Sequence, residues 1–249
     1  MQSDKLINRG DSVHKLVFLH YFGGSAGSWQ WVIPQLEDKF HCVALNLPGF
    51  GGTTALNEPS LVSMAQWVLK ELALLDIYDF TLIGHSMGGK IALQMATMPS
   101  EMEIHQLILV APSPPSFEPM PIIEKERMLH HPDTKEAAQT VENSIGKNLS
   151  EHKKNFAIET QLSADHSSWE WWLNEGKNHS IVEEVQGLEI PVTVISSDDD
   201  PVISRDVINE EVMPNIPKVQ LVQTRDAGHL LPLEKPDWLA EQIRIIAKK

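Results

Sequence analysis

Apolar residues along the chain gather in short continuous runs, and these runs alternate with segments of helical spacing. The runs contain β-branched residues and cover residues 15–20, 41–47, 80–83 and 106–111, and two further strands are predicted at residues 190–195 and 218–222. Continuous apolar runs of this length are typical of strands buried on both faces of a parallel sheet. A further short strand is expected at residues 5–8, before a turn at residues 9–11.

Between these runs, apolar residues recur at the period of a helix. The clearest case is residues 60–75, where Ser60 follows Pro59 and suits the N-cap position. Shorter helices are predicted over residues 28–36, 91–96, 204–212 and 237–247. The alternation of buried strands and helices predicts an α/β fold, in which helices flank a mostly parallel central sheet.

One segment breaks this alternation. Residues 112–121 contain five prolines, which excludes both a central strand and a helix interior. From there to about residue 187 the chain is polar, and its only patterns are helical, over residues 122–130, 134–145, 150–162 and 168–174. We interpret residues 1–249 as a single domain with a small helical cap inserted at residues 112–187.

Three tryptophans, Trp169, Trp171 and Trp172, lie close together in this cap. They either anchor the cap to the main domain, or one or more of them line the substrate pocket. The sequence leaves both interpretations open, and all three are candidate substrate-binding residues.

Charge and composition restrict the partners. The chain has 34 acidic and 20 basic residues and a formal net charge of −14, which argues against nucleic acid or a membrane as a partner. Its single cysteine, Cys42, lies in an apolar run, so that no disulfide can form within the chain. The first residues lack a signal-peptide pattern, and no apolar stretch approaches the ~18 residues of a membrane span. We expect a cytoplasmic protein, and the sequence leaves open whether it forms a homo-oligomer.

The strand-like run at residues 80–83 leads through Gly84-His85-Ser86-Met87-Gly88 directly into the helical pattern at residues 91–96. A strand, a sharp turn and a helix with serine at the apex are the features of a nucleophile elbow. Glycines two residues either side of Ser86 suit so tight a turn, because a Cβ there would clash. Ser86 is therefore the candidate nucleophile.

A serine hydroxyl needs a base, and the base needs an orienting carboxylate. Among the 11 histidines, His229 stands out because it lies between the last predicted strand and the last helix. The run Asp198-Asp199-Asp200 follows another strand and supplies candidate carboxylates, although such a run also suits a solvated loop. It is a poor metal site without nearby histidines, and no metal or other cofactor is expected.

Backbone N–H groups of Met87 and Phe22 are candidates for an oxyanion hole. Phe22 belongs to the Gly-rich loop at residues 20–27, which lacks the glycine and lysine pattern of a phosphate-binding loop. Tyr21 and Phe22 are also candidate substrate-binding residues. His85 is a further candidate because it adjoins Ser86, but adjacent elbow residues point in different directions, which favours packing and hydrogen bonding for His85.

Five stretches resemble motifs of the α/β-hydrolase superfamily, and they occur in the order of that family. They are residues 20–24 for the oxyanion loop, 47–51 for the D-x-P-G-x-G turn, 84–89 for the nucleophile, 197–202 for the acid loop, and 228–236 for the histidine stretch. The chain departs from the family at Tyr21, Asn46 and Ser197, where glycine, aspartate and glycine are usual. The first strand of the family's sheet is missing, so about seven strands are expected.

The resemblance implies a serine hydrolase, most similar to the small carboxylesterases and perhydrolase-like members. It would cleave esters of small to medium acyl substrates through an acyl-serine. Asp200 is favoured as the acid, because in the family a short apolar stretch follows the acid, and residues 201–203 supply one. A lactonase, a carbon–carbon bond hydrolase, a cofactor-free perhydrolase and a receptor-like binding protein with little turnover remain alternatives, because fold alone does not fix function.

Overall fold

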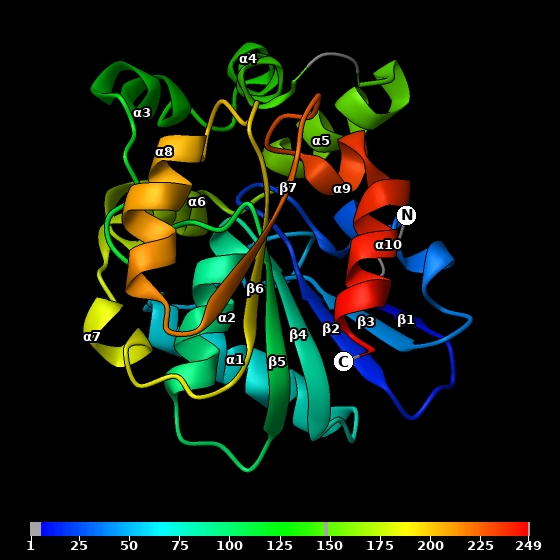
Figure 1. Ribbon diagram of the computed structural model, residues 1–249. Helices are drawn as coiled ribbons and strands as arrows, with labels where there is room; N and C mark the ends of the chain where they lie inside the picture. The colour runs from blue at the N-terminus through cyan, green and yellow to red at the C-terminus, as the bar shows by residue number, and fades with distance from the viewer. Residues whose placement is uncertain (1–5, 147–148, 249) are drawn as a thin grey trace.

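The computed structural model describes residues 6–146 and 149–248. Seven strands form one sheet in the order β1-β3-β2-β4-β5-β6-β7 (Figure 1). Their bounds are Leu6–Arg9, Lys15–Leu19, His41–Leu45, Asp79–His85, Glu103–Val110, Val192–Ser197 and Val219–Thr224 for β1 to β7. Only β1 runs antiparallel to its neighbour, β3, and the other neighbouring pairs are parallel. The mostly parallel, seven-stranded sheet confirms the predicted fold class.

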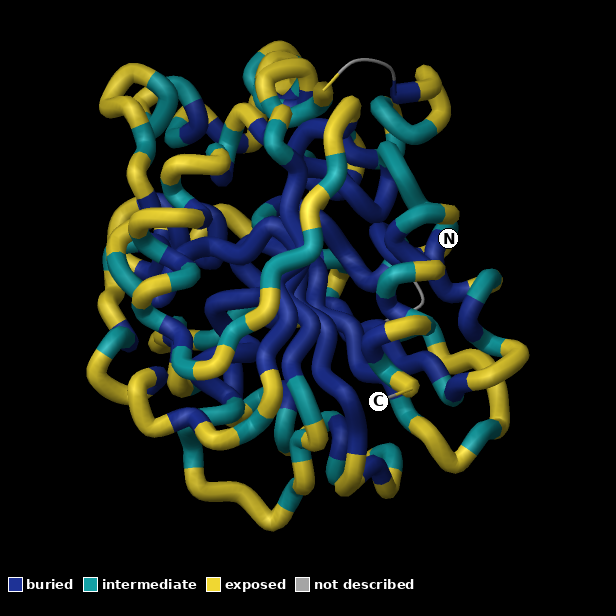
Figure 2. The backbone as a smooth tube through the Cα atoms, viewed as in Figure 1, coloured by how far each residue is buried: buried dark blue, intermediate teal, exposed yellow. Residues whose placement is uncertain are grey.

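Alternate side chains of the strands face two different apolar layers. Val17 and Leu19 of β2 pack on one face, with α1 (Leu61–Leu74) and α2 (Met87–Thr97). Leu16 and Phe18 pack on the other face, with α10 (Pro236–Ile246). Because successive strand residues point to opposite faces, a strand that is covered on both sides must be apolar throughout. Figure 2 shows the buried centre of the sheet as a continuous dark block.

Two predicted helices form in a different way. Residues 28–36 contain two short 3₁₀ helices, Ala26–Trp29 and Ile33–Gln35, instead of one α-helix. Pro34 lies in the second of them, and its ring excludes the α-helical hydrogen bond and crowds the preceding turn. Residues 204–212 form α8 (Arg205–Val207), which continues as a π-helical turn, Ile208–Val212. The short α9 (Leu231–Glu234) precedes α10.

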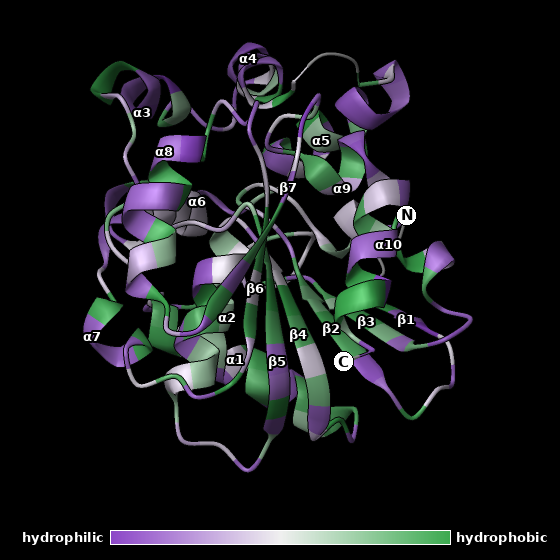
Figure 3. Cartoon of the chain, in the orientation of Figure 1, coloured by the Kyte–Doolittle hydropathy of each residue, from purple (hydrophilic) through white to green (hydrophobic). Residues whose placement is uncertain are grey.

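Between β5 and β6 the chain forms a series of short helices. They are α3 (Ile122–Met128), α4 (Thr134–Ser144), α5 (Glu151–Leu162), α6 (His166–Asn174), a 3₁₀ helix (Gly176–Asn178) and α7 (Val182–Val185). Figure 1 shows α3, α4 and α5 together at one end of the molecule. Figure 3 shows that α4 is more polar than the central strands of the sheet. We keep the name cap for residues 112–187. None of the helices in the described part of the chain is long and apolar enough to cross a membrane.

Candidate active site

The serine lies in a strained turn between β4 and α2. Ser86 has φ 53° and ψ −116°, a left-handed conformation that a residue with a side chain rarely adopts. The backbones on either side of the turn lie very close together, and glycine makes this possible because it has no Cβ. A Cβ on Gly84 would lie 2.4 Å from the carbonyl oxygen of Gly88. A Cβ on Gly88 would lie 2.6 Å from the carbonyl oxygen of His20. Both positions therefore require glycine, as the elbow pattern indicates.

The structure brings Ser86, His229 and Asp200 into one hydrogen-bonded chain. Ser86 Oγ lies 2.9 Å from His229 Nε2, and His229 Nδ1 lies 2.9 Å from Asp200 Oδ2. All three residues are buried. The other oxygen of Asp200, Oδ1, accepts hydrogen bonds from the N–H groups of Val202 at 2.7 Å and Ile203 at 2.9 Å. These bonds fix the carboxylate, so that its free oxygen points at the imidazole.

The two neighbouring aspartates have other partners. Asp198 accepts hydrogen bonds from the side chains of Gln223 at 2.9 Å and Arg225 at 3.2 Å. Asp199 accepts one from the N–H of Asp226 at 2.7 Å. Of the three adjacent aspartates, Asp200 is the one that meets His229.

The surroundings of His229 favour its protonated form. Burial lowers its pKa, but the charge of Asp200 and the hydrogen bond to it act in the opposite direction. The charges of Glu118 and Glu234 add to this effect, and the pKa is raised above its ordinary value. An imidazole with this environment is suited to accept a proton from a serine hydroxyl.

Two other buried histidines hold the loops around the serine. The N–H of Leu47 donates to Nε2 of His20 at 3.0 Å, so the proton is on Nδ1, which donates to the carbonyl of Tyr21 at 2.8 Å. Burial lowers the pKa of His20 to about 4, which keeps the ring neutral. His85 Nε2 lies 2.8 Å from the carbonyl oxygen of His229 and steadies that loop. Burial also lowers the pKa of His85 well below its ordinary value.

Both candidate oxyanion-hole groups are unoccupied donors. Met87 is the first residue of α2, so its N–H has no acceptor within the helix. The N–H of Phe22 makes no hydrogen bond within residues 6–146 and 149–248. Phe22 and Ser86 line the same cavity.

Two departures from the family pattern have structural roles. Asn46 accepts a hydrogen bond from the N–H of Ala26 at 2.6 Å and donates one to the carbonyl of Gly51 at 2.8 Å. An aspartate would lack the amide donor for the second bond. Ser197 donates to the carbonyl of Ala227 at 2.6 Å and so connects the loop of Asp200 with the loop of His229.

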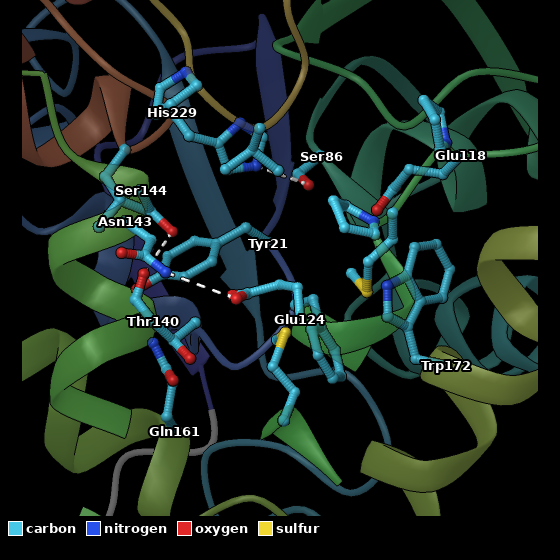
Figure 4. Close-up of a pocket in the computed structure, with 18 of the residues that line it drawn as sticks. Tyr21, Ser86, Glu118, Glu124, Thr140, Asn143, Ser144, Gln161, Trp172 and His229 are labelled. Atoms are coloured by element: carbon cyan, nitrogen blue, oxygen red, sulfur yellow. Dashed lines mark hydrogen bonds between the residues drawn. The ribbon is translucent and has the colours of Figure 1, made fainter. Parts of the chain in front are cut away.

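A cavity of about 320 Å³ opens over Ser86 and His229 (Figure 4). Of the candidate substrate-binding residues, Tyr21, Phe22 and Trp172 line it. His85, Trp169 and Trp171 are not part of its lining. The expectation for the substrate pocket is thus corrected for these three residues, and each has a physical reason to lie elsewhere.

His85 is fully buried behind the elbow, where it bonds to the loop of His229. Trp169 lies behind Phe22, at 4.2 Å between ring centroids, and its Nε1 donates to the carbonyl of Met128 at 2.8 Å. Trp171 is buried on the far side of α6 and lines a separate surface cleft that includes Leu56. These two tryptophans pack the cap onto the main domain.

The sequence analysis missed the polar residues that the cap contributes to the cavity. They are Glu118, Glu124, Thr140, Asn143, Ser144 and Gln161. Figure 4 shows Thr140, Asn143 and Ser144 along one face of α4. Their spacing of three and four residues places them on one helix face, but a polar face usually indicates solvent. The sequence contains no signal that this face covers a cavity.

The cap is bonded directly to the loop of His229. The His229 N–H donates to the carbonyl of Ser144 at 2.7 Å. One oxygen of Glu234, Oε2, accepts from the N–H of Gly228 at 2.9 Å and from that of Gly146 at 2.8 Å. The backbones approach so closely that a Cβ on Gly228 would lie 2.4 Å from the nitrogen of Gly146. These hydrogen bonds therefore fix the end of α4 against the loop that carries His229.

Comparison with known proteins agrees with this geometry. The family model of the alpha/beta hydrolase family matches residues 16–242, which is most of the chain. The chain therefore belongs to the alpha/beta hydrolase family, and the resemblance described above is confirmed.

Similar proteins include hydrolases and esterases. The hydrolase YugF of Bacillus subtilis (strain 168) is 24% identical over 241 residues, which cover 92% of this chain and 88% of YugF. A pimeloyl-(acyl-carrier protein) methyl ester esterase of Klebsiella pneumoniae is 36% identical over 108 residues, but the match spans only 43% of this chain and 39% of the esterase. The esterase EaEST of Exiguobacterium antarcticum has the same fold, with a TM-score of 0.89, 17% identity and coverage of 98% of this chain and 95% of EaEST.

Proposed function

We propose that this hydrolase cleaves carboxylic esters of small to medium acyl groups, with Ser86 as nucleophile, His229 as general base and Asp200 as the orienting acid. The observation that carries the proposal is the chain of two 2.9 Å hydrogen bonds joining these side chains at the floor of the cavity. The strained elbow that exposes Ser86 supports it. The esterases among the similar proteins support the same reaction class.

In the first half of the reaction, Ser86 Oγ attacks the carbonyl carbon while its proton moves to His229 Nε2. The negative charge that develops on the carbonyl oxygen accepts hydrogen bonds from the N–H groups of Met87 and Phe22. Asp200 holds His229 with Nδ1 protonated and stabilises the imidazolium. The intermediate then breaks its bond to the alcohol oxygen, which takes the proton from Nε2 and leaves an acyl-serine.

In the second half, water replaces the alcohol. His229 takes a proton from the water as its oxygen attacks the acyl carbon, and the proton then returns to Ser86 Oγ as the free acid departs. This cycle uses no metal or organic cofactor.

We also propose a cytoplasmic location on the sequence features given above.

A fluorophosphonate probe tests the assignment. We expect one adduct on the intact protein, on the peptide that contains Ser86. The Ser86→Ala variant should label no longer and should lose roughly 10⁴–10⁶ in turnover of an activated ester. An adduct on another residue, or full activity in Ser86→Ala, would show that the nucleophile is elsewhere.

The acyl preference is measured with activated esters of increasing acyl length, beside a lactone and a peroxide-plus-acetate assay. A decrease in kcat/KM beyond medium acyl lengths is the expected profile, because the cavity is enclosed by the cap. Turnover confined to the lactone or to peracid formation would replace the ester assignment with one of the alternatives that share the triad. A single burst without turnover would instead indicate a binding protein.

A further inference from the structure

One cavity residue has a polar atom that no part of the described chain satisfies. Glu118 is 6% exposed, and its Oε2 is buried without a hydrogen-bond partner in residues 6–146 and 149–248. Buried carboxylate oxygens normally accept hydrogen bonds, and leaving one without a donor costs free energy. Glu118 lines the same cavity as Ser86 and His229, and Figure 4 shows it on the side of Trp172, across from Thr140 and Asn143.

The main chain of Glu118 is held firmly without its carboxylate. Its N–H donates to the carbonyl of Lys177 at 3.0 Å. Its own carbonyl accepts from the Nζ of Lys177, also at 3.0 Å. The hydrogen bonds that fix this segment of the cap therefore come from its main chain, while the charge of the carboxylate offsets the burial of Lys90 and Lys177.

Two buried lysines, Lys90 and Lys177, lie near Glu118, but within the described residues neither donates a hydrogen bond to its carboxylate. The Nζ of Lys90 donates to the carbonyls of Ser116 at 2.7 Å and of Lys177 at 3.1 Å. Burial lowers the pKa of Lys90 to about 8, and the charge of Glu118 opposes this decrease. The Oε2 of Glu118 thus has no hydrogen-bond donor from either lysine.

The rest of the cavity favours a positive ligand. Its lining includes no lysine or arginine within the described residues, and its second carboxylate, Glu124, is already paired with Arg127. The aromatic rings of Tyr21, Phe22 and Trp172 form part of the wall, and aromatic faces attract cations. The charge of Glu118 also reaches the catalytic end of the cavity, since it contributes to the raised pKa of His229.

We propose that Glu118 determines substrate specificity: it binds an ammonium group of the substrate, so that the preferred esters carry a positively charged nitrogen with N–H donors. This inference rests on the proposed ester hydrolysis. It extends that function by naming a class of substrate, esters that carry an ammonium group. A charged hydrogen bond of this kind is worth about 10- to 100-fold in affinity.

Competition between matched ligands tests the proposal. Hexylammonium chloride and 1-hexanol have the same chain, and at about pH 7.5 the amine is protonated. Each is titrated as an inhibitor of activated-ester hydrolysis, and its binding is measured by calorimetry. We expect hexylammonium to bind about 10- to 100-fold more tightly than hexanol. In Glu118→Gln, which removes the charge and keeps the shape, the two should bind within about threefold of each other.

Glu124→Gln is the matched control, because it removes a carboxylate from the same cavity. Glu124 is already paired with Arg127, whose Nε lies 3.1 Å from its Oε2. The preference for hexylammonium should therefore persist in this variant. Loss of the preference in Glu124→Gln, with no loss in Glu118→Gln, would overturn the assignment to Glu118.

Equal binding of the two ligands to the unmodified protein overturns the proposal whatever the variants do, so the test does not depend on the folding of Glu118→Gln. A preference that is unchanged in folded Glu118→Gln also overturns it. Calorimetry separates this inference from the proposed function. If no ester is hydrolysed but hexylammonium binds through Glu118, the ester function fails and the ammonium site stands.

Discussion

The loops at the ends of the strands and the cap contribute to the cavity in different ways. Ser86, Asp200 and His229 are each placed by the backbone at a strand end, and each is fixed by short hydrogen bonds. The cap contributes side chains from short polar helices, such as Thr140 and Asn143 of α4. The strand ends hold groups that react, and the cap holds groups that can discriminate between ligands.

This difference has a physical cause. Ser86 and Asp200 inherit their positions from β4 and β6, whose residues are almost all buried, so that moving either strand would disturb the core. Helix α4 of the cap buries only one face, with Ala137 and Val141 as its buried residues. Substitutions in the cavity wall of the cap can therefore change ligand preference, whereas changes at the strand ends are expected to abolish the reaction.

The largest expected effect in this comparison is at Asp200. Asp200→Asn keeps the shape but favours the wrong tautomer of His229, and turnover of an activated ester should fall by roughly 10⁴. Asp199→Asn is the control, because it removes an adjacent charge whose carboxylate accepts a hydrogen bond from the N–H of Asp226, whereas His229 bonds to Asp200; its effect should be within several-fold. Circular dichroism checks the fold of both. Near-normal turnover in Asp200→Asn would mean that the orienting acid is another residue.

The pH dependence of kcat/KM should depend both on His229 at a strand end and on Glu118 in the cap. The base must be neutral to accept the serine proton, so kcat/KM should increase with pH through the pKa of His229 and fall about tenfold per unit below it. Because this pKa is raised, the midpoint should lie above the ordinary value of about 6.5. Glu118→Gln removes a cap charge that raises the pKa, and should move the midpoint to lower pH. A midpoint unchanged in this variant would show that the cap charge does not reach the base.

The smallest expected effect concerns the cavity wall. Trp172→Phe enlarges the cavity, and the ratio of kcat/KM for long over short acyl esters should increase several-fold. Trp171→Phe is matched in chemistry but lies outside the cavity lining, so it should lower thermal stability and leave this ratio unchanged. The same shift in both variants would contradict the placement of Trp172 as the wall residue.

The sequence predicted the sheet and singled out Ser86, Asp200 and His229, which the structure brings together, because both have strong local signals. The apolar runs of β2 and β6 have the pattern of buried strands, and Ser86 has a motif in which each glycine has a steric reason. The helices of the cap could also be predicted, since Asp133 caps α4 by accepting hydrogen bonds from the N–H groups of Lys135 and Glu136.

The lining of the cavity could not be predicted, because it depends on how the cap lies against the sheet. The three tryptophans have the same chemistry and nearly adjacent positions, yet only Trp172 lines the cavity. Glu118 lies in a proline-rich stretch that resembles an exposed loop, but it is buried and makes two hydrogen bonds with Lys177, which is distant in the sequence. Residues 28–36 show a smaller limit: Pro34 counts against a continuous helix in their later part, but the pattern of apolar residues does not distinguish an α-helix from the two 3₁₀ turns found there.

The junction between α4 and the histidine loop restricts how this protein can be re-engineered. Because Ser144 and Gly146 bond to the backbone of His229 and to Glu234, a cap taken from another hydrolase cannot simply replace residues 112–187. A chimera would need a backbone carbonyl placed like that of Ser144 and a glycine at position 146, where a Cβ would lie 2.6 Å from the nitrogen of Gly228, or the base would lose its alignment. Cap exchange should therefore keep residues 144–146 with the recipient and graft only the helices on either side.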